Sequence, residues 1–279
     1  MRIEPLDATL GAVVTDVRLA ELDDATWVEV EAAFHEHAVL VFPGQHLTKD
    51  EQLAFATRFG ALEDLGYGPG NTPIANTTRE GGVRPADDPV LTILRGNEGW
   101  HTDSSYMPLA AKASMLSAHV VPSRGGRTEW ADMRAAYEAL DDATKARIAP
   151  LSAHHSYIYS QEKMGEKVVV GSRYGFHDGP APLRPLVKMH PVTGRPSLFL
   201  GRHAYGIPGL SDEESESLLA TLLDDACQPP RVYSHDWSVG DIIVWDNRCV
   251  LHRAQPWAWD EPRVMFHTRI SGDPQTEGS

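Results

Sequence analysis

The chain has 279 residues, 42% hydrophobic and 23% charged, which is enough to bury a sizeable core. Its formal net charge of -14 argues against nucleic acid or an anionic membrane as the main partner. No apolar run approaches the roughly 18 residues of a membrane span, and the N-terminus lacks the pattern of a signal peptide. We therefore expect a cytoplasmic protein. The lack of CxxC spacing at Cys227 and Cys249 favours free thiols.

The first sixty residues predict two helices and two short strands. The strands are expected at 11–15 and 39–42, where the residues are apolar. Residues 23–38 have apolar side chains at helical spacing after an Asp cap, and a second helix over 48–60 begins with capping-box spacing. Two histidines of the first helix lie two residues apart and are expected at the surface, on different sides of the helix: His35 and His37.

Residues 61–90 are rich in Gly, Pro and Asn and have little periodicity, so they predict a long loop. Long loops inside compact domains are often functional lids. Because this loop leads almost directly to His101, we interpret it as a lid over a site there. A solvated surface excursion is the alternative.

The remaining chain predicts many short strands and a few helices. Helices are expected over 131–140, over 141–151 and over 210–226, where Ser211 and Glu214 have capping-box spacing. Strands are expected at 113–121, 242–245, 249–252 and 264–270, with a hairpin loop at 191–195. This pattern is typical of a jelly-roll sandwich, mainly β with flanking helices, and we expect one domain over 1–279.

His101 and Asp103 lie two residues apart in a segment bounded by apolar runs that resemble strands. Side chains at i and i+2 of a strand point the same way, so an imidazole and a carboxylate would share one face. These are two members of the 2-His-1-carboxylate triad that binds Fe(II). His252, which follows an apolar strand, is the natural third ligand. The alternatives are that His101 is a surface histidine near a turn aspartate and that His252 is a core histidine.

The last predicted strand places polar residues on one face. Arg263, His267 and Arg269 occupy odd positions and therefore point the same way. Such a face is hard to explain as core, so it favours a functional site near His252 over a core histidine there. An exposed strand face is the competing interpretation.

Several motifs occur together in order: His101-x-Asp103, Gly125-Gly126-Arg127-Thr128, Trp245-Asp246-Asn247-Arg248, His252 and Arg263. In combination they resemble the taurine dioxygenase and 2,4-D dioxygenase family of Fe(II), 2-oxoglutarate-dependent oxygenases. The resemblance covers nearly the whole chain and implies a double-stranded β-helix, a cupin-like jelly roll. It also implies Fe(II) on His101, Asp103 and His252, with O2 and 2-oxoglutarate as co-substrates. The co-substrate site would include Thr128, Arg263 and Trp245.

The residues expected to bind the substrate differ from those of the taurine enzyme. The arginine that grips the sulfonate there, four residues after Arg263, is replaced by His267. The resemblance is strongest to the aryloxyalkanoate branch and implies cleavage of an aryloxyalkanoate to a phenol and an oxo acid. A sulfonate such as taurine, or another carboxylate, is the alternative. We expect the anionic substrate at Asn97, His267 and Arg269. Other candidate anion contacts are Arg202, His203, His154 and His155.

Two interpretations from other classes stay open. A cupin-like binding protein that has lost turnover would keep the fold without the reaction. A zinc hydrolase would use the same two histidines and aspartate for a different metal. Succinate formation that depends on Fe(II) distinguishes both from a dioxygenase. The sequence leaves open whether the protein forms a homo-oligomer.

Overall fold

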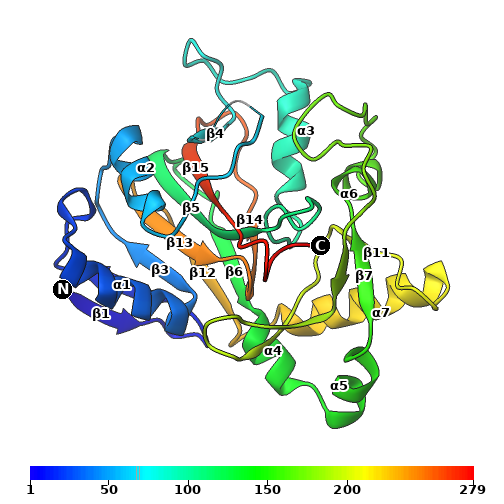
Figure 1. Ribbon diagram of the computed structural model, residues 1–279. Coiled ribbons are helices and arrows are strands. Elements are labelled where there is room, and N and C mark those ends of the chain that lie inside the picture. The colour runs from blue at the N-terminus through cyan, green and yellow to red at the C-terminus, as the bar shows by residue number, and fades with distance from the viewer. Residues whose placement is uncertain (67, 69) are drawn as a thin grey trace.

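The computed structural model describes residues 1–66, 68 and 70–279 (Figure 1). It is a mixed α/β structure with several antiparallel sheets. The largest sheet has seven strands, listed here in spatial order: β1 (Arg2–Pro5), β2 (Ala12–Thr15), β3 (Val39–Phe42), β13 (Ile242–Asp246), β5 (Ala111–Val120), β15 (Val264–Ser271) and β4 (Thr72–Ala75). Neighbouring strands are antiparallel except for the parallel pair β2 and β3.

A second sheet has three strands in the order β12 (Val232–His235), β6 (Thr128–Asp132) and β14 (Val250–Ala254). One apolar cluster joins this sheet to one face of the large sheet through Trp130, Leu116 and Trp245. A separate cluster packs Phe34 and Phe55 against the other face of the large sheet. The space between the two sheets is therefore the place where side chains of both can converge on a site.

The helices follow from local sequence. α1 (Asp24–His37) and α2 (Lys49–Thr57) cover the outer face of the large sheet (Figure 1). The capping boxes predicted at Thr48 and Ser211 are both formed, the second at the start of α7 (Asp212–Ala226). α4 (Met133–Ala139) and α5 (Asp142–Ile148) also confirm their predictions.

The remaining elements build the side of the molecule around α7 (Figure 1). They include α6 (Tyr157–Glu162), the sheet β11 (Ala204–Tyr205), β7 (Ser152–His155) and β8 (Leu183–Pro185), and the hairpin β9 (Val187–Met189) and β10 (Pro196–Leu198). The 3-10 helix η1 (Leu19–Glu21) lies elsewhere, beside α2, where Leu19 joins the apolar cluster of Phe34 and Phe55. The hairpin loop expected at 191–195 connects β9 and β10, as predicted.

Four predictions from the sequence were wrong. The apolar run before His101 forms helix α3 (Pro89–Gly96), capped by Asp88 with proline in its first turn, and not a strand. The region 61–90 is not one loop, because β4 within it pairs with β15. The chain is not mainly β, because helices take about as much of it as strands. His35 and His37 are half-buried rather than exposed.

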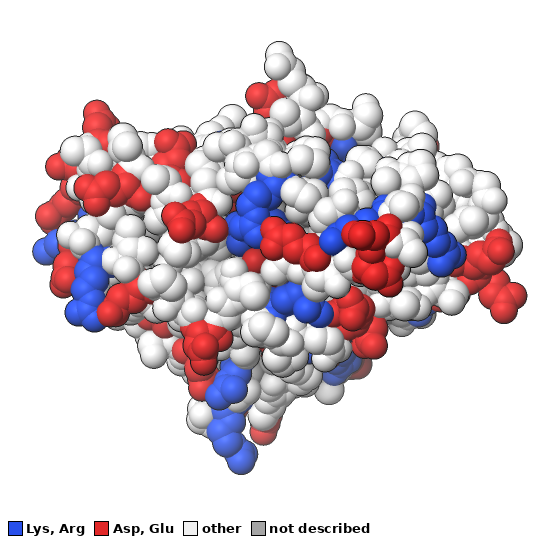
Figure 2. Space-filling model, turned by 90° about the horizontal axis from the view of Figure 1, so that it is seen from below, with Lys and Arg blue, Asp and Glu red and all other residues white. Residues whose placement is uncertain are grey.

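Charge and hydropathy give two further observations. Figure 2 shows acidic side chains interleaved with Lys and Arg over the face that it presents. Among the described residues, no helix has the length and apolar character needed to cross a membrane. Both cysteines are free thiols, Cys249 buried and Cys227 partly so.

Candidate active site

His101, Asp103 and His252 converge as predicted. Each offers one ligand atom, these atoms lie within 4.8 Å of one another, and all three residues are buried. Nε2 of His252 is 3.6 Å from Oδ2 of Asp103. The rings of His101 and His252 have centroids 4.2 Å apart. Two imidazoles and a carboxylate in this arrangement form a metal site.

The backbone reason for this convergence differs from the one expected. His101 is not in a strand but forms an isolated antiparallel bridge with His252, in which N–H of each residue donates to the carbonyl of the other, at 3.0 and 2.8 Å. Asp103 then lies in a turn, followed by Ser104 at a φ of 54°. The bridge aligns the two histidines, and the turn brings the carboxylate back toward them.

The protonation states suit a divalent cation. Nδ1 of His101 lies 2.8 Å from the Gly99 carbonyl and so carries the proton, which leaves Nε2 as the free ligand atom. Burial lowers the pKa of His101 to about 4 and that of His252 well below its usual value. Burial opposes ionisation of Asp103, but the positive charge of Arg269 and the neighbouring histidines hold its pKa well below the usual range. The site therefore presents two neutral imidazoles and an anion.

The nine residues that the sequence places in the site surround one small cavity of about 60 Å³. They are Asn97, His101, Asp103, Thr128, Trp245, His252, Arg263, His267 and Arg269. Ile74, Leu116 and Ala254 complete the lining with apolar atoms. Within the described chain, none of the four other candidate anion contacts lines this cavity. Arg202, for example, donates to the carbonyl oxygens of Gly96 and Ser160 instead.

Arg263 is a buried cation, only 3% exposed. Its Nε donates to the Gly126 carbonyl at 3.2 Å, and its guanidinium lies 5.1 Å from the centre of the Trp257 ring. No carboxylate forms an ion pair with it in the part of the chain that the structure describes. Burial therefore lowers its pKa to about 10. A buried guanidinium without an acidic partner calls for an anionic ligand.

Thr128 begins β6 and also lines the cavity. Its hydroxyl oxygen accepts a hydrogen bond from Nε1 of Trp237 at 2.9 Å. Because a hydroxyl both accepts and donates, its own hydrogen can point at a ligand. Thr128 and Arg263 can thus serve the same anion.

Trp245 lines the same cavity with its ring. Its indole N–H donates to Oδ1 of Asn247 at 3.1 Å, so this donor is already engaged. Its ring is stacked on His267, at 5.8 Å between centroids, and contacts His252 at 4.7 Å. Trp245 is therefore a flat wall of the site rather than a donor to a ligand.

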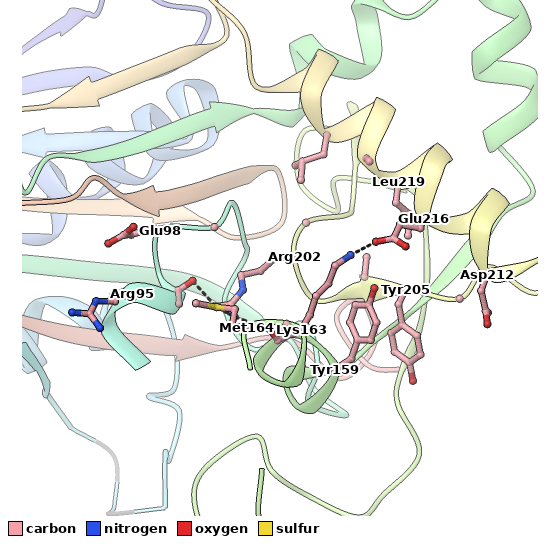
Figure 3. Close-up of a pocket in the computed structure, with 18 residues that line it drawn as sticks. Arg95, Glu98, Tyr159, Lys163, Met164, Arg202, Tyr205, Asp212, Glu216 and Leu219 are labelled. Carbon is pink, nitrogen blue, oxygen red and sulfur yellow. Dashed lines mark hydrogen bonds and ion pairs between the residues drawn. The ribbon is translucent and has the colours of Figure 1, made fainter. Parts of the chain in front are cut away.

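A much larger cavity, of about 830 Å³, is lined in part by the residues that precede His101 in the chain (Figure 3). It is bounded by α6, α7 and the segment that contains Gly99. Lys163 forms an ion pair with Glu216 across it, and Arg202 donates to a backbone carbonyl. Lys163, Glu216 and Arg202 are thus partnered, and the metal ligands face the smaller cavity instead.

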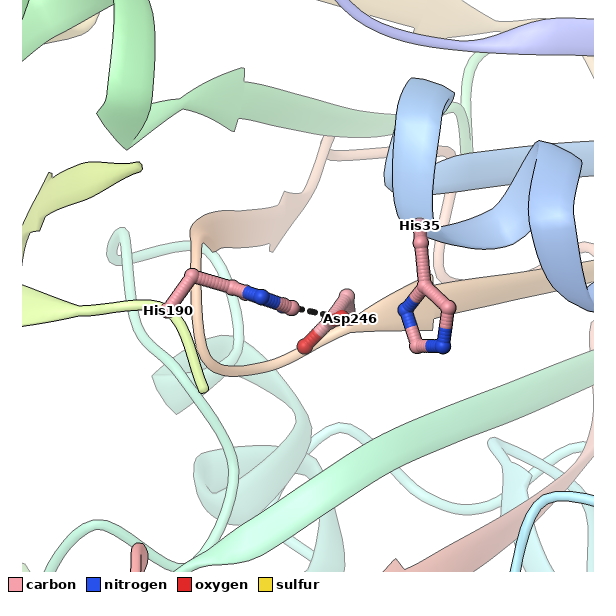
Figure 4. A group of neighbouring side chains, drawn as sticks. All are labelled: His35, His190 and Asp246. Atoms are coloured by element: carbon pink, nitrogen blue, oxygen red, sulfur yellow. Dashed lines mark hydrogen bonds and ion pairs between the residues drawn. The ribbon is translucent and has the colours of Figure 1, made fainter. Parts of the chain in front are cut away.

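His35, His190 and Asp246 form a second group with the composition of a metal site (Figure 4). Nδ1 of His190 accepts from the N–H groups of Val192 and Thr193, so the proton is on Nε2, which lies 3.0 Å from Oδ2 of Asp246. The His190 nitrogen that faces the carboxylate is therefore a donor and offers no lone pair to a metal. This group is a structural hydrogen-bond cluster.

Sequence reasoning missed several residues around the site. Ser114 and Asn247 contact Asp103, and Trp237 contacts Thr128. Asn76 accepts from the Arg263 N–H at 2.7 Å, although it lies in the region expected to be a loop. Of these residues, only Asn247 could have been predicted from the sequence, because it lies within a motif on which the resemblance rests.

Comparison with known proteins agrees with this geometry. The family model "Taurine catabolism dioxygenase TauD, TfdA family" matches residues 2–269. An (S)-phenoxypropionate/alpha-ketoglutarate-dioxygenase of Sphingobium herbicidovorans is 56% identical over 99% of this chain and 96% of its own. An alpha-ketoglutarate-dependent 2,4-dichlorophenoxyacetate dioxygenase of Cupriavidus pinatubonensis is 40% identical over 90% of this chain and 91% of its own.

Among solved structures, AAD-2 in complex with Mn(II) and N-oxalylglycine superposes with a TM-score of 0.88 at 38% identity, over 97% of this chain and 96% of that one. The fold and the site thus define a metal-dependent dioxygenase. The chain belongs to the TauD/TfdA family of dioxygenases.

Proposed function

We propose that this dioxygenase uses Fe(II), O2 and 2-oxoglutarate, also called alpha-ketoglutarate, to oxidise an aryloxyalkanoate. The products would be a phenol, a short oxo acid, succinate and CO2. The observation that carries the proposal is the buried Arg263, which faces the metal-site cavity with no acidic partner among the described residues. The relatives named for phenoxypropionate and 2,4-dichlorophenoxyacetate supply the substrate class.

The donor set fits Fe(II). His101 and His252 are neutral, Asp103 is ionised, and all three face one cavity. Iron held by these three ligands would have positions left for a co-substrate and O2, and would supply the oxidising chemistry. The side chains of the protein bind, orient and exclude water around it.

Arg263 and Thr128 would bind the distal carboxylate of 2-oxoglutarate. The guanidinium offers a planar fork that matches a carboxylate, and the hydroxyl adds a second donor. Trp245 would form an apolar wall of the site beside the histidines. In the reaction, one oxygen atom of O2 goes to succinate as CO2 leaves, and the other to the substrate.

The substrate carboxylate would bind at His267 and Arg269. Nε of Arg269 is buried and has no hydrogen-bond partner among the described residues, so it is a free donor. Asn97 lines the same cavity. A hydroxyl added to the carbon next to the ether oxygen gives a hemiacetal or hemiketal, which collapses to the phenol and the oxo acid.

The aromatic ring of the substrate would lie under the lid expected at 61–90. Ile74 of β4 and Leu116 of β5 supply apolar lining on that side. Two residues of the expected lid, Tyr67 and Pro69, lie outside the described residues. We further infer that the two facing sheets form a double-stranded β-helix within one domain over 1–279. A cytoplasmic location, the absence of nucleic acid as a partner and any homo-oligomer stay predictions.

A side-by-side assay tests this function. Phenol release is measured from 2,4-D and from both enantiomers of a phenoxypropionate, sulfite release from taurine, and succinate from each, with and without Fe(II). We expect Fe(II)-dependent phenol from at least one aryloxy acid, and taurine at least about tenfold poorer in kcat/KM, or about 1.4 kcal/mol. Taurine as the better substrate would overturn the substrate class alone. Succinate-free binding, or hydrolysis with Zn(II), would instead favour a binding protein or a hydrolase.

A further inference from the structure

We propose that Asn247 and Ser114 are positioning residues that orient the carboxylate of Asp103 for the metal. They form a directed chain of hydrogen bonds in which the Asn247 amide donates to Ser114, and the Ser114 hydroxyl donates to Oδ2 of Asp103. All three side chains are buried. This role rests on the proposed assignment of Asp103 as a metal ligand.

The orientation of the Asn247 amide follows from its neighbours. Its Oδ1 lies 3.1 Å from Nε1 of Trp245 and 3.3 Å from the backbone nitrogen of Asp103. An indole N–H and a backbone N–H can only donate, so this atom of Asn247 must be the oxygen. The NH2 group therefore points the other way, toward Ser114.

The direction of the second hydrogen bond follows in turn. Nδ2 of Asn247 is 2.8 Å from Oγ of Ser114, and this amide group can only donate. Ser114 therefore accepts there and has its single hydrogen left for Asp103, whose Oδ2 is 2.7 Å away. No other orientation satisfies both the N–H donors at one end and the carboxylate acceptor at the other. The chain can deliver a hydrogen only toward the carboxylate.

This hydrogen bond acts on the oxygen that faces the metal site. Oδ2 of Asp103 is the oxygen 3.6 Å from Nε2 of His252, whereas Oδ1 is 2.9 Å from Nη2 of Arg269. Ser114 and Arg269 thus hold the two oxygens separately. Rotation of the carboxylate about its Cβ–Cγ bond would break both contacts, so its plane is fixed before a metal binds.

Asn247 also ties together the two segments that bear the ligands. It lies in the turn between β13 and β14, and β14 contains His252. Its backbone carbonyl accepts from the Thr102 hydroxyl at 2.8 Å, and its side chain accepts from the Asp103 N–H. One residue therefore sets the position of Asp103 relative to His252.

The turn that holds Asn247 is itself fixed. Its neighbour Asp246 accepts from Arg248 at 2.8 Å and lies 3.0 Å from Nε2 of His190 (Figure 4). These groups are buried as well. The cluster of His35, His190 and Asp246 thus supports the turn that holds Asn247, and Asn247 in turn positions Asp103.

Ser114→Ala removes the last hydrogen bond of the chain, and Ser117→Ala is its matched control. Both serines are buried in β5 and both donate to a side chain, but Ser117 donates to Gln52. The Kd for Mn(II) is measured by titration with electron paramagnetic resonance, and the Tm is measured without metal. Loss of a hydrogen bond to a metal-ligating side chain typically weakens metal binding by about 10–100-fold.

We expect Ser114→Ala to weaken Mn(II) binding within that range, and Ser117→Ala to change it by less than about threefold. The KM for 2-oxoglutarate, measured at saturating metal, should change much less than the metal Kd, because Arg263 and Thr128 are untouched. Equal Mn(II) affinity in the two variants would overturn the proposal. A purely structural role would lower the Tm without this selective loss of affinity.

Asn247→Ala and the double variant provide a second test. Because Ser114 acts downstream of Asn247, the double variant should bind Mn(II) about as weakly as Asn247→Ala alone. Additive losses would contradict a chain that acts as one unit. If the unaltered protein bound no Mn(II), the assignment of the metal ligands would fail first, and this role with it.

Discussion

Arg269 and Asp103 form a buried ion pair in which Nη2 lies 2.9 Å from Oδ1, with side chains 15% and 2% exposed. Nη1 of Arg269 lies 3.2 Å from Oγ of Ser104 as well. The pair keeps the carboxylate ionised in a site from which water is largely excluded. A metal cation bound at this site would therefore share the negative charge of Asp103 with Arg269.

Arg269→Gln should destabilise the metal-free protein and increase its response to metal. Removal of one partner of a buried ion pair costs about 3–5 kcal/mol, because the remaining charge is unpaired. Mn(II) would then neutralise Asp103, so the rise in Tm on saturation with Mn(II) should be larger in the variant than in the unaltered protein. Arg195→Gln, which breaks an exposed pair with Glu138, is the control. A Tm rise equal to or below that of the unaltered protein would contradict the shared-charge relationship.

Alanine at any one of the three metal ligands should abolish turnover. His101→Ala, Asp103→Ala and His252→Ala each leave two ligands, which cannot hold iron with the required geometry. Succinate release and the Mn(II) Kd are measured for each, with the exposed His46→Ala as control. Circular dichroism shows whether each variant folds. Succinate production near that of the unaltered protein by any folded variant would remove that residue from the metal centre.

Arg263→Lys should raise the KM for 2-oxoglutarate with a smaller effect on kcat. A lysine ammonium is a point charge and cannot form the two parallel hydrogen bonds of a guanidinium. Loss of a charged hydrogen bond costs about 1.5–3 kcal/mol, which corresponds to a roughly tenfold to hundredfold increase. Arg127→Lys, at an exposed ion pair with Asp236, is the control. An unchanged KM would move the co-substrate carboxylate to another residue, with Arg269 the first candidate.

His155 should make the stability of the fold depend on pH. It is 1% exposed, and neither ring nitrogen has a hydrogen-bond partner among the described residues. Burial, aided by the charge of Arg184, lowers its pKa to about 3. Between pH 3 and pH 6.5 the unfolded chain therefore binds one more proton here than the folded protein, so stability is lost as the pH falls.

Replacement by phenylalanine should remove this dependence. His155→Phe keeps a ring against Phe199, whose centroid is 5.4 Å away. Between pH 7 and pH 5 the histidine should cost the unaltered protein about 2 kcal/mol of unfolding free energy that the variant does not lose. Urea unfolding at the two pH values measures the difference. Parallel losses in both proteins would show that His155 titrates normally.

The sequence allowed the ligands to be predicted because their chemistry is carried by residue type and order. Arg263, His267 and Arg269 were placed on one face by alternation alone. His267 and Arg269 of β15 reach the same cavity as Arg263, which directly precedes that strand. The capping boxes at Thr48 and Ser211 could also be predicted from the sequence, because a capping box depends on two residues only three positions apart.

Features that depend on distant partners were not predictable. The run 89–96 is a different case, because Asp88 and Pro89 are a local signal for the start of a helix that its apolar residues masked. β4 forms in a region rich in glycine and proline because the edge of β15 is there to pair with it. Ser114 belongs to no motif, and its role follows from three segments that meet only in the folded chain.

The backbone bridge between His101 and His252 joins residues about 150 positions apart in the chain. During synthesis, at about 5–20 residues per second, the His101–Asp103 pair therefore precedes His252 by roughly 8–30 seconds. A nascent chain thus carries only two of the three ligands for that interval, and the sheets that bring the third into place cannot close until β14 and β15 have been made. We therefore expect a metal to be held by all three ligands only after β14 has been made.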